Sequence, residues 1–211
     1  MDSLIKFRSL ANEHDFERAK EIIEKGQFWC SKLWNHNDPM EGIFSTYNYS
    51  SIDSLFDGKN NYVICSFALP EALNEPLLWG YYANGFKGIA IEIEPKNNET
   101  FKEIQYDTES EYYNKIFERT DDIPDIITRK LDNWKHEQEV RFIKKSKKET
   151  LYNIGSIKKV HFGTPYQNAS NYQKIHDNSR TLRKYAFLKN ELKLICDDKG
   201  IETAEYVHQN R

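Results

Sequence analysis

Cysteine is scarce in this chain, and the three cysteines lie far apart. Cys30, Cys65 and Cys196 form no CxxC pair and have no histidine at a metal-ligand spacing. This pattern argues against a disulfide framework and against a zinc site. It favours buried thiols in a reducing compartment, and we expect no bound metal.

Long apolar runs and a charge excess of one sign are also missing. No window is apolar over the length that crosses a bilayer, and "MDSLIKFRSL" lacks the apolar run of a signal peptide. The 30 basic and 33 acidic residues are scattered and give a net charge of −3. Such a charge provides no overall field for nucleic acid or an anionic membrane. We therefore expect a cytoplasmic protein without a membrane partner.

The common nucleotide and hydrolase motifs are absent too. The glycines of "GYYANGFKG", at positions 80, 85 and 88, fit neither GxGxxG nor GxxxxGK[ST]. The sequence contains no GxSxG elbow and no HExxH pair, and its six histidines never lie four residues apart. Nucleotide binding through a glycine-rich phosphate loop is therefore not expected.

What the sequence does contain predicts one α+β domain over residues 1–211. With 38% hydrophobic and 14% aromatic residues, the chain can bury one core. Strand-like runs alternate irregularly with helix-like runs, which favours a mixed, mostly antiparallel sheet flanked by helices. The expected strands are 4–9, 27–31, 62–67, 88–95, 103–107, 137–143 and 156–163, and the expected helices are 12–26, 47–58, 110–117, 123–134 and most of 167–188. The Asp-Lys-Gly turn within 191–207 predicts a C-terminal β-hairpin.

The stretch "WKHEQEVRF", residues 134–142, carries the most conspicuous polar pattern. On a strand, Glu137, Glu139 and Arg141 point to one face, while Val140 and Phe142 point to the other. Such a polar face is either solvated, with cross-strand partners, or the site of chemistry.

Several segments together resemble a widespread bacterial family that is classified as a domain of unknown function, number twenty-nine seventy-one. The segments are "FWCSKLWNHNDPMEG", "CSFALPEALNEPLLWGYYANGFKGIAIEI", "KLDNWKHEQEVRFI" and "IKKVHFG". The resemblance covers about residues 4–163 and leaves 164–211 as a C-terminal elaboration of a helix and a β-hairpin. Its marks are Asn37-Asp38-Pro39 with Glu41, Trp79 to Ala83 with Lys87-Gly88, and Trp134 with Glu137, Glu139 and Arg141.

The order "KFRS", "GQFWCS", "EQEV" is similar to the three-part signature of ADP-ribosyltransferases of the arginine-serine-glutamate type. This resemblance implies NAD as a substrate and an ADP-ribosyltransferase-like fold. Glu139 would stabilise the oxocarbenium-like state of the ribose, and Glu137 would orient the attacking nucleophile. Arg8 would pair with the NAD phosphates, and Ser31 would support nicotinamide, although Lys32 follows Ser31 where the family has Thr-Ser.

The remaining candidates would complete a nucleotide site. Trp79, Tyr81 or Tyr82 would cover a ring of the ligand, unless these aromatic residues belong to the core. The candidate ligand-binding residues are Arg8, Ser31, Asn37, Asp38, Trp79, Tyr81, Tyr82 and Arg141. We expect the Asn-Asp-Pro loop, the aromatic turn and the two glutamates to converge on one concave surface, since sites are usually assembled from separate loops.

Two other functions fit the same residues. One is a metal-dependent nuclease or phosphodiesterase that uses Asp38, Glu41, Glu137 and Glu139. The other is a non-enzymatic binding module, in which the aromatic and Asn-Asp-Pro segments form a recognition groove. With NAD chemistry, the protein would suit a bacterial toxin or phage-defence effector, and its acceptor, protein or nucleic acid, stays open.

Overall fold

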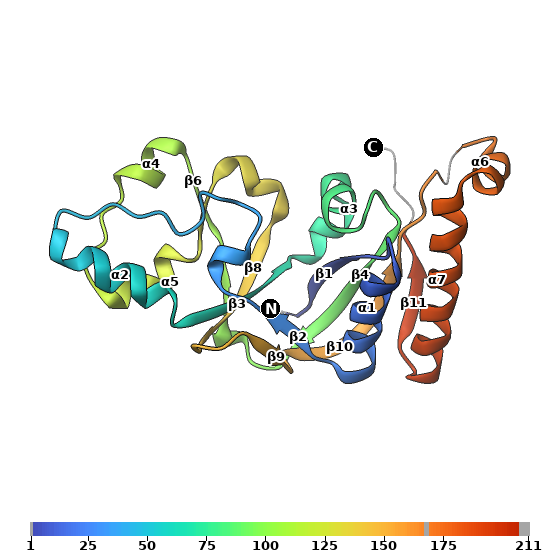
Figure 1. Cartoon of the computed structure of the whole chain (residues 1–211), viewed down its shortest axis with the longest axis horizontal. Helices are drawn as coiled ribbons and strands as arrows, with labels where there is room; N and C mark the ends of the chain where they lie inside the picture. The colour runs from blue at the N-terminus through green and yellow to red at the C-terminus, as the bar shows by residue number, and fades with distance from the viewer. Residues whose placement is uncertain (1, 167–168, 207–211) are drawn as a thin grey trace. The chain divides into compact units, whose positions relative to one another are not determined.

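The computed structural model describes residues 2–166 and 169–206, and the chain forms two compact units (Figure 1). Unit 1 consists of Met1–Gln27, Leu69–Lys96 and Asn153–Arg211, and unit 2 consists of Phe28–Ala68 and Asn97–Tyr152. Each unit is thus built from segments that are distant in sequence. The expected single domain over residues 1–211 stays a prediction.

Unit 1 combines a strand set with several helices. Its strands are β1 (Leu4–Ser9), β4 (Gly88–Pro95), β10 (Gly155–Phe162) and β11 (Glu202–Glu205). They lie in the order β11-β10-β4-β1, with only the β10–β11 pair parallel. Its helices are α1 (Glu13–Lys25), η3 (Pro70–Asn74), α3 (Pro76–Tyr82), α6 (Tyr172–Asn178) and α7 (Arg180–Asp198), and α1 packs against α7.

Helix α1 begins and ends where its sequence predicts. The side chain of Asn12 accepts a hydrogen bond from the Asp15 backbone N–H at 3.0 Å, which satisfies a donor of the first turn. Gly26 ends the helix in the left-handed region, at φ 61°. Ala19 and Ile22 lie on the buried face, as the apolar spacing indicates.

The predicted C-terminal β-hairpin is wrong. Residues 191–198 continue helix α7, because Leu188, Leu192 and Cys196 recur every four residues and are all buried. The Asp-Lys-Gly sequence ends this helix, with Gly200 at φ 66°. Strand β11 then pairs in parallel with β10, so the segment is a helix followed by a strand.

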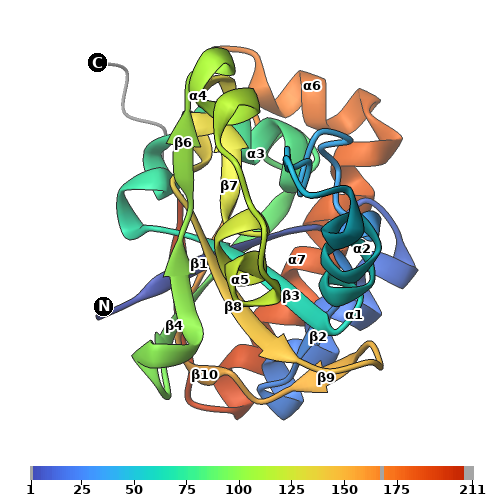
Figure 2. The same ribbon diagram turned by 90° about the vertical axis from the view of Figure 1, so that its left-hand side faces the viewer.

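Unit 2 contains three small groups of strands. Strands β3 (Tyr62–Ala68), β8 (Glu139–Lys145) and β5 (Phe101–Glu103) lie antiparallel in that order, and Figure 2 shows β3 and β8 side by side. Strand β2 (Phe28–Cys30) pairs with β9 (Thr150–Tyr152), and β6 (Gln105–Asp107) pairs in parallel with β7 (Arg129–Leu131). Its helices are η1 (Leu33–Asn35), η2 (Tyr49–Ser51), α2 (Ile52–Lys59), η4 (Asn98–Thr100), α4 (Glu109–Asn114), η5 (Thr120–Asp122), α5 (Ile123–Ile126) and η6 (Asp132–Glu137).

The predicted helix over 123–134 is also wrong, because it divides into α5, β7 and η6. Arg129 is buried and donates from Nε to Asp107 at 2.6 Å. The neighbouring Lys130 is drawn into a second group of buried ion pairs. These tertiary contacts outweigh the weak helix preference of a short segment.

The fold class is α+β, with helices and mostly antiparallel strands, as expected. The core of unit 2 joins α2, β3, α5 and the loop after α4 through Leu55, Ile64, Ile123 and Phe117. All three cysteines are buried thiols, as expected. Within residues 2–166 and 169–206, no helix has the length and apolar character needed to cross a membrane.

Candidate functional site

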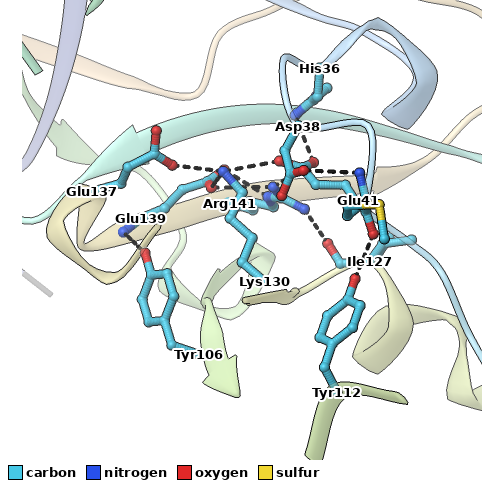
Figure 3. Close-up of polar contacts among 11 residues, drawn as sticks. His36, Asp38, Glu41, Tyr106, Tyr112, Ile127, Lys130, Glu137, Glu139 and Arg141 are labelled. Carbon is cyan, nitrogen blue, oxygen red and sulfur yellow. Dashed lines mark hydrogen bonds and ion pairs between the residues drawn. The ribbon is translucent and has the colours of Figure 1, made fainter. Parts of the chain in front are cut away.

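A buried ion cluster in unit 2 is centred on Lys130 (Figure 3). The Nζ atom of Lys130 lies 2.9 Å from Glu41, 2.7 Å from Glu137 and 2.7 Å from Glu139. An ammonium has three donors, so each carboxylate can receive one. Burial by itself would lower the pKa of Lys130, but Glu139, Glu41 and Glu137 outweigh it and raise the pKa above its usual range.

Arg141 is the second cation of this cluster, and it is fully buried. Its Nε and Nη2 atoms donate to the two oxygens of Glu139 at 2.7 and 3.2 Å, and Nη1 donates to the Ile127 carbonyl at 2.6 Å. Its Nη2 also lies 2.8 Å from Glu41 Oε2. Burial would raise the pKa of Glu139, but Arg141 and Lys130 outweigh it and hold the pKa well below its usual range.

The local backbone explains how two glutamates reach one ammonium. Glu137 is the last residue of η6, and Gln138 then adopts a left-handed conformation at φ 44°, before β8 begins at Glu139. Glu137 therefore does not lie on the strand, and the predicted shared strand face is wrong for it. The solvated-face interpretation is wrong as well, because Glu137, Glu139 and Arg141 are 4%, 5% and 0% exposed.

The Asn-Asp-Pro loop supplies the edge of the cluster. Asp38 Oδ1 accepts a hydrogen bond from the Met40 backbone N–H at 2.9 Å, the turn that the sequence indicates. The Tyr112 hydroxyl donates to the Met40 carbonyl at 2.8 Å and fixes this turn. His36 Nδ1 lies 3.4 Å from Glu41 Oε2. Asp38 Oδ2 is buried and has no hydrogen-bond partner within the described part of the chain.

A pocket of about 380 Å³ opens beside this loop. His36, Asp38 and Glu41 form its polar side. Trp34 and Phe56, whose ring centroids are 5.2 Å apart, form part of its aromatic side. Polar groups that converge on one side of a mostly apolar cavity are the usual form of a small-molecule site.

Lys59 closes the aromatic side of the pocket. Its Nζ atom lies 4.7 Å from the ring centre of Trp34, 4.9 Å from that of Phe44 and 5.3 Å from that of Phe56. It also donates to the Gly42 carbonyl at 2.7 Å, which ties α2 to the loop. Burial lowers the pKa of Lys59 to about 8.

Of the other predicted residues in unit 2, Ser31 and Asn37 lie outside the pocket lining. Ser31 pairs with Ile64, while Glu139 pairs with Ala68 at the other end of β3. Four strand residues span about 13 Å, so Ser31 is not beside Glu139. Asn37 is exposed in the loop between His36 and Asp38.

Trp79, predicted to cover a ligand ring, is a core residue of unit 1. It is 0% exposed. Its ring stacks on Tyr206 at 4.6 Å and on Phe86 at 5.7 Å, and its Nε1 donates to the Leu73 carbonyl at 2.8 Å. The alternative assignment of this residue to the core is therefore the correct one.

Three further candidates, Arg8, Tyr81 and Tyr82, also belong to unit 1. Arg8 lies on β1 and is half-buried, opposite Ile89 of β4. Tyr81 is 65% exposed on α3, and its ring is 6.5 Å from that of Tyr82. The expectation that these residues share one concave surface with Asp38 and the glutamates stays a prediction.

Four residues of the ion cluster and the pocket are absent from the predicted site: Lys130, Lys59, Trp34 and His36. Lys130 falls within the run 123–134, which the sequence predicts to be helical. Lys59 is the last residue of α2, and nothing in the sequence of this helix indicates that the lysine side chain is buried. A tryptophan among the polar residues of the 32–41 loop was the one available signal for Trp34. Burial of a lysine depends on distant carboxylates or rings, which the local sequence does not specify.

Comparison of the chain with protein-family models, with curated proteins and with solved structures found no match. The resemblances to the bacterial family and to ADP-ribosyltransferases therefore stay predictions. The nuclease alternative also stays a prediction, although the Lys130 ammonium binds three of its four carboxylates, Glu41, Glu137 and Glu139. Among residues 2–166 and 169–206, no group of three or more His, Cys, Asp or Glu side chains is arranged to hold a metal ion.

Proposed function

We propose that the pocket of unit 2 binds the nicotinamide end of NAD and that the protein cleaves the ribose–nicotinamide bond, transferring ADP-ribose to water or to an acceptor. The observation that carries this proposal is the carboxylate of Asp38. It is 6% exposed and lines the pocket, and its Oδ2 accepts no hydrogen bond within the described residues. A buried carboxylate oxygen without a partner is costly, and a cationic ligand removes that cost.

The charges around the pocket favour such a ligand. Asp38, Glu41, Glu137 and Glu139 bring four negative charges, and Lys130, Arg141 and Lys59 bring three positive charges, so the sum is −1. The oxidised nicotinamide ring is a cation, and positive charge develops on the ribose as its bond to nitrogen breaks. A fixed carboxylate stabilises that charge most in the transition state.

The aromatic side of the pocket supports the same ligand. Trp34 and Phe56 line the pocket, and the Lys59 ammonium, which donates to the Gly42 carbonyl, lies over one face of each ring. A flat heteroaromatic ligand would gain stacking energy on ring surface that Lys59 does not cover.

His36 is positioned to act as the general base. A carboxylate only accepts hydrogen bonds, so Glu41 favours the tautomer with hydrogen on His36 Nδ1, 3.4 Å away. Nε2 then keeps its lone pair and can take a proton. In hydrolysis, nicotinamide leaves with the electrons of the C1′–N bond, water oxygen bonds to C1′, and the water proton passes to Nε2.

Glu139, the expected catalytic carboxylate, has a different role in this proposal. Both of its oxygens are bound by Arg141, and Lys130 binds one of them. It positions Glu41 through the two cations that they share, and Glu41 in turn orients His36. Asp38 takes the direct role beside the ribose.

Nicotinamide release from NAD tests the proposal. Asp38→Asn keeps the shape of the side chain and removes its charge, so turnover should fall about 100-fold. Asp121→Asn, at an exposed aspartate of the same unit, is the matched control and should keep full activity. Wild-type protein that releases no nicotinamide, with water and candidate acceptors supplied, contradicts the proposal.

A further inference from the structure

An exposed apolar stripe runs along the helical segment from η2 into α2. Tyr49, Ile52 and Phe56 are 85%, 38% and 49% exposed, and their spacing of three and four residues places them on one side of the helical segment. Trp34, 46% exposed, extends the stripe through its contact with Phe56. These four residues, three aromatic and one aliphatic, are together called the aromatic stripe.

The start of the stripe is held in place by local hydrogen bonds. Asn48 Oδ1 accepts from the Ser50 backbone N–H at 3.1 Å and from the Ser50 hydroxyl at 2.6 Å, which fixes the turn that carries Tyr49. Leu55, which precedes Phe56 in α2, is fully buried in the core of unit 2 and anchors this helix. A rigid surface that presents aromatic rings loses little entropy when a partner binds.

The charges beside the stripe are negative. Asp53 and Asp57 are exposed on α2, one turn apart, and the one basic residue of this helix, Lys59, is 4% exposed. Neither aspartate forms an ion pair with another residue that the structure describes. Helix η5, which packs against α2, adds the exposed Asp121, and the exposed Arg119 at its N-cap lies 3.9 Å from Asp122.

We propose that the aromatic stripe is a docking surface for a basic segment of a partner protein. Arginine or lysine side chains of the segment would pair with Asp53 and Asp57, and their apolar stems would lie on Tyr49 and Ile52. Guanidinium groups stack well on aromatic rings, and opposite charge at the edge speeds encounter. Nucleic acid fits poorly, because its phosphates would meet the two aspartates.

This surface leads into the proposed catalytic site but does not depend on NAD cleavage. Trp34 and Phe56 belong to the stripe and also line the pocket. A docked segment would therefore lie at the pocket mouth.

Binding of labelled probes to the full chain tests the proposal without any turnover. The probes are a short peptide of alternating arginine and leucine, the same peptide with glutamate in place of arginine, and a single-stranded oligothymidine, each followed by fluorescence anisotropy. We expect the arginine peptide to bind at least tenfold more tightly than either other probe, with an affinity that weakens as salt rises. Equal or tighter binding of the glutamate peptide or the oligonucleotide overturns the proposal, as does the absence of binding by all three.

Variants at exposed positions locate the contact. Asp53→Asn with Asp57→Asn should weaken binding of the arginine peptide about tenfold, and Tyr49→Ala about fivefold. Phe187→Ala, at a 63% exposed aromatic residue of α7 in unit 1, is the control and should change nothing. Unchanged affinity in the Asp53/Asp57 and Tyr49 variants, or an equal loss in the control, overturns the assignment to the stripe. Nicotinamide release without an acceptor should be unaffected by the aspartate variants, so this test fails or succeeds separately from the proposed reaction.

Discussion

The ion cluster around Lys130 and the polar side of the pocket both contain buried carboxylates. The two regions differ in how many hydrogen-bond and ion-pair partners these carboxylates have. In the cluster, Glu139 contacts Arg141 through both oxygens and Lys130 through one. On the polar side of the pocket, Asp38 uses Oδ1 in its own turn and leaves Oδ2 without a hydrogen bond from any described residue. A buried carboxylate whose oxygens all have hydrogen-bond or ion-pair partners stabilises the fold. A buried carboxylate oxygen without a partner is instead a candidate ligand-binding group.

Lys130 tests the structural side of this comparison most strongly. Lys130→Met leaves Glu41, Glu137 and Glu139 without their shared cation, so the free energy of unfolding should fall by about 3–5 kcal/mol. Urea denaturation followed by circular dichroism measures this change. Lys135→Met, at an exposed lysine of η6, is the control and should change the free energy by less than about 0.5 kcal/mol. Similar stability of both variants would show that the cluster does not support the fold.

Glu139→Gln should come next, with a loss of about 2–3 kcal/mol, because its neutral amide leaves Arg141 and Lys130 incompletely paired. The pKa of Glu139 is lowered in the folded state, so its contribution is present above the unfolded pKa and is lost as pH falls through the folded pKa. Wild-type stability should therefore decline below about pH 4.5. The variant should lose less on acidification, and an unchanged acid slope would contradict this assignment.

Lys59 should show a smaller effect, in an alkaline pH window. Burial lowers its pKa to about 8, so between pH 8 and about 10 the folded state has released a proton that the unfolded state still holds. Stability should therefore rise across this interval in the wild type. In Lys59→Met the rise should be reduced, as thermal unfolding at several pH values will show. Equal slopes in both proteins would place the Lys59 amine in a more solvated position.

Asp38→Asn should cause no loss of stability, because the amide can still accept the Met40 hydrogen bond, no cation loses a partner and an unpaired buried charge is removed. The same variant should show the large loss of nicotinamide release proposed above. A loss of stability comparable to that of Glu139→Gln would remove the distinction between the two groups of carboxylates. The two variants compared in one unfolding experiment decide this point.

The sequence predicted the elements that depend on local rules. Helix α1 follows from Asn12, Gly26 and the apolar spacing between them, and β3 and β4 follow from their β-branched and aromatic runs. It also drew attention to the Asn-Asp-Pro loop and to the "EQEVR" stretch, which do meet in space: Arg141 contacts Glu41. Charged side chains that alternate with apolar residues on a buried strand need partners of opposite charge. The local sequence was therefore enough to identify this stretch as unusual.

Only the tertiary structure decided which partners these charged side chains have and which buried carboxylate has an oxygen without a partner. Lys130 reaches the carboxylates because Asp107 and Arg129 hold β7 against β6, and Gln138 turns left-handed so that Glu137 and Glu139 can share one ammonium. Neither step follows from propensity, since each is favourable only through contacts between distant residues. The sequence by itself therefore determined which segments carry charge and which fold locally. Burial, set by packing across the whole of unit 2, determined that Glu139 is saturated and that Asp38 faces a pocket.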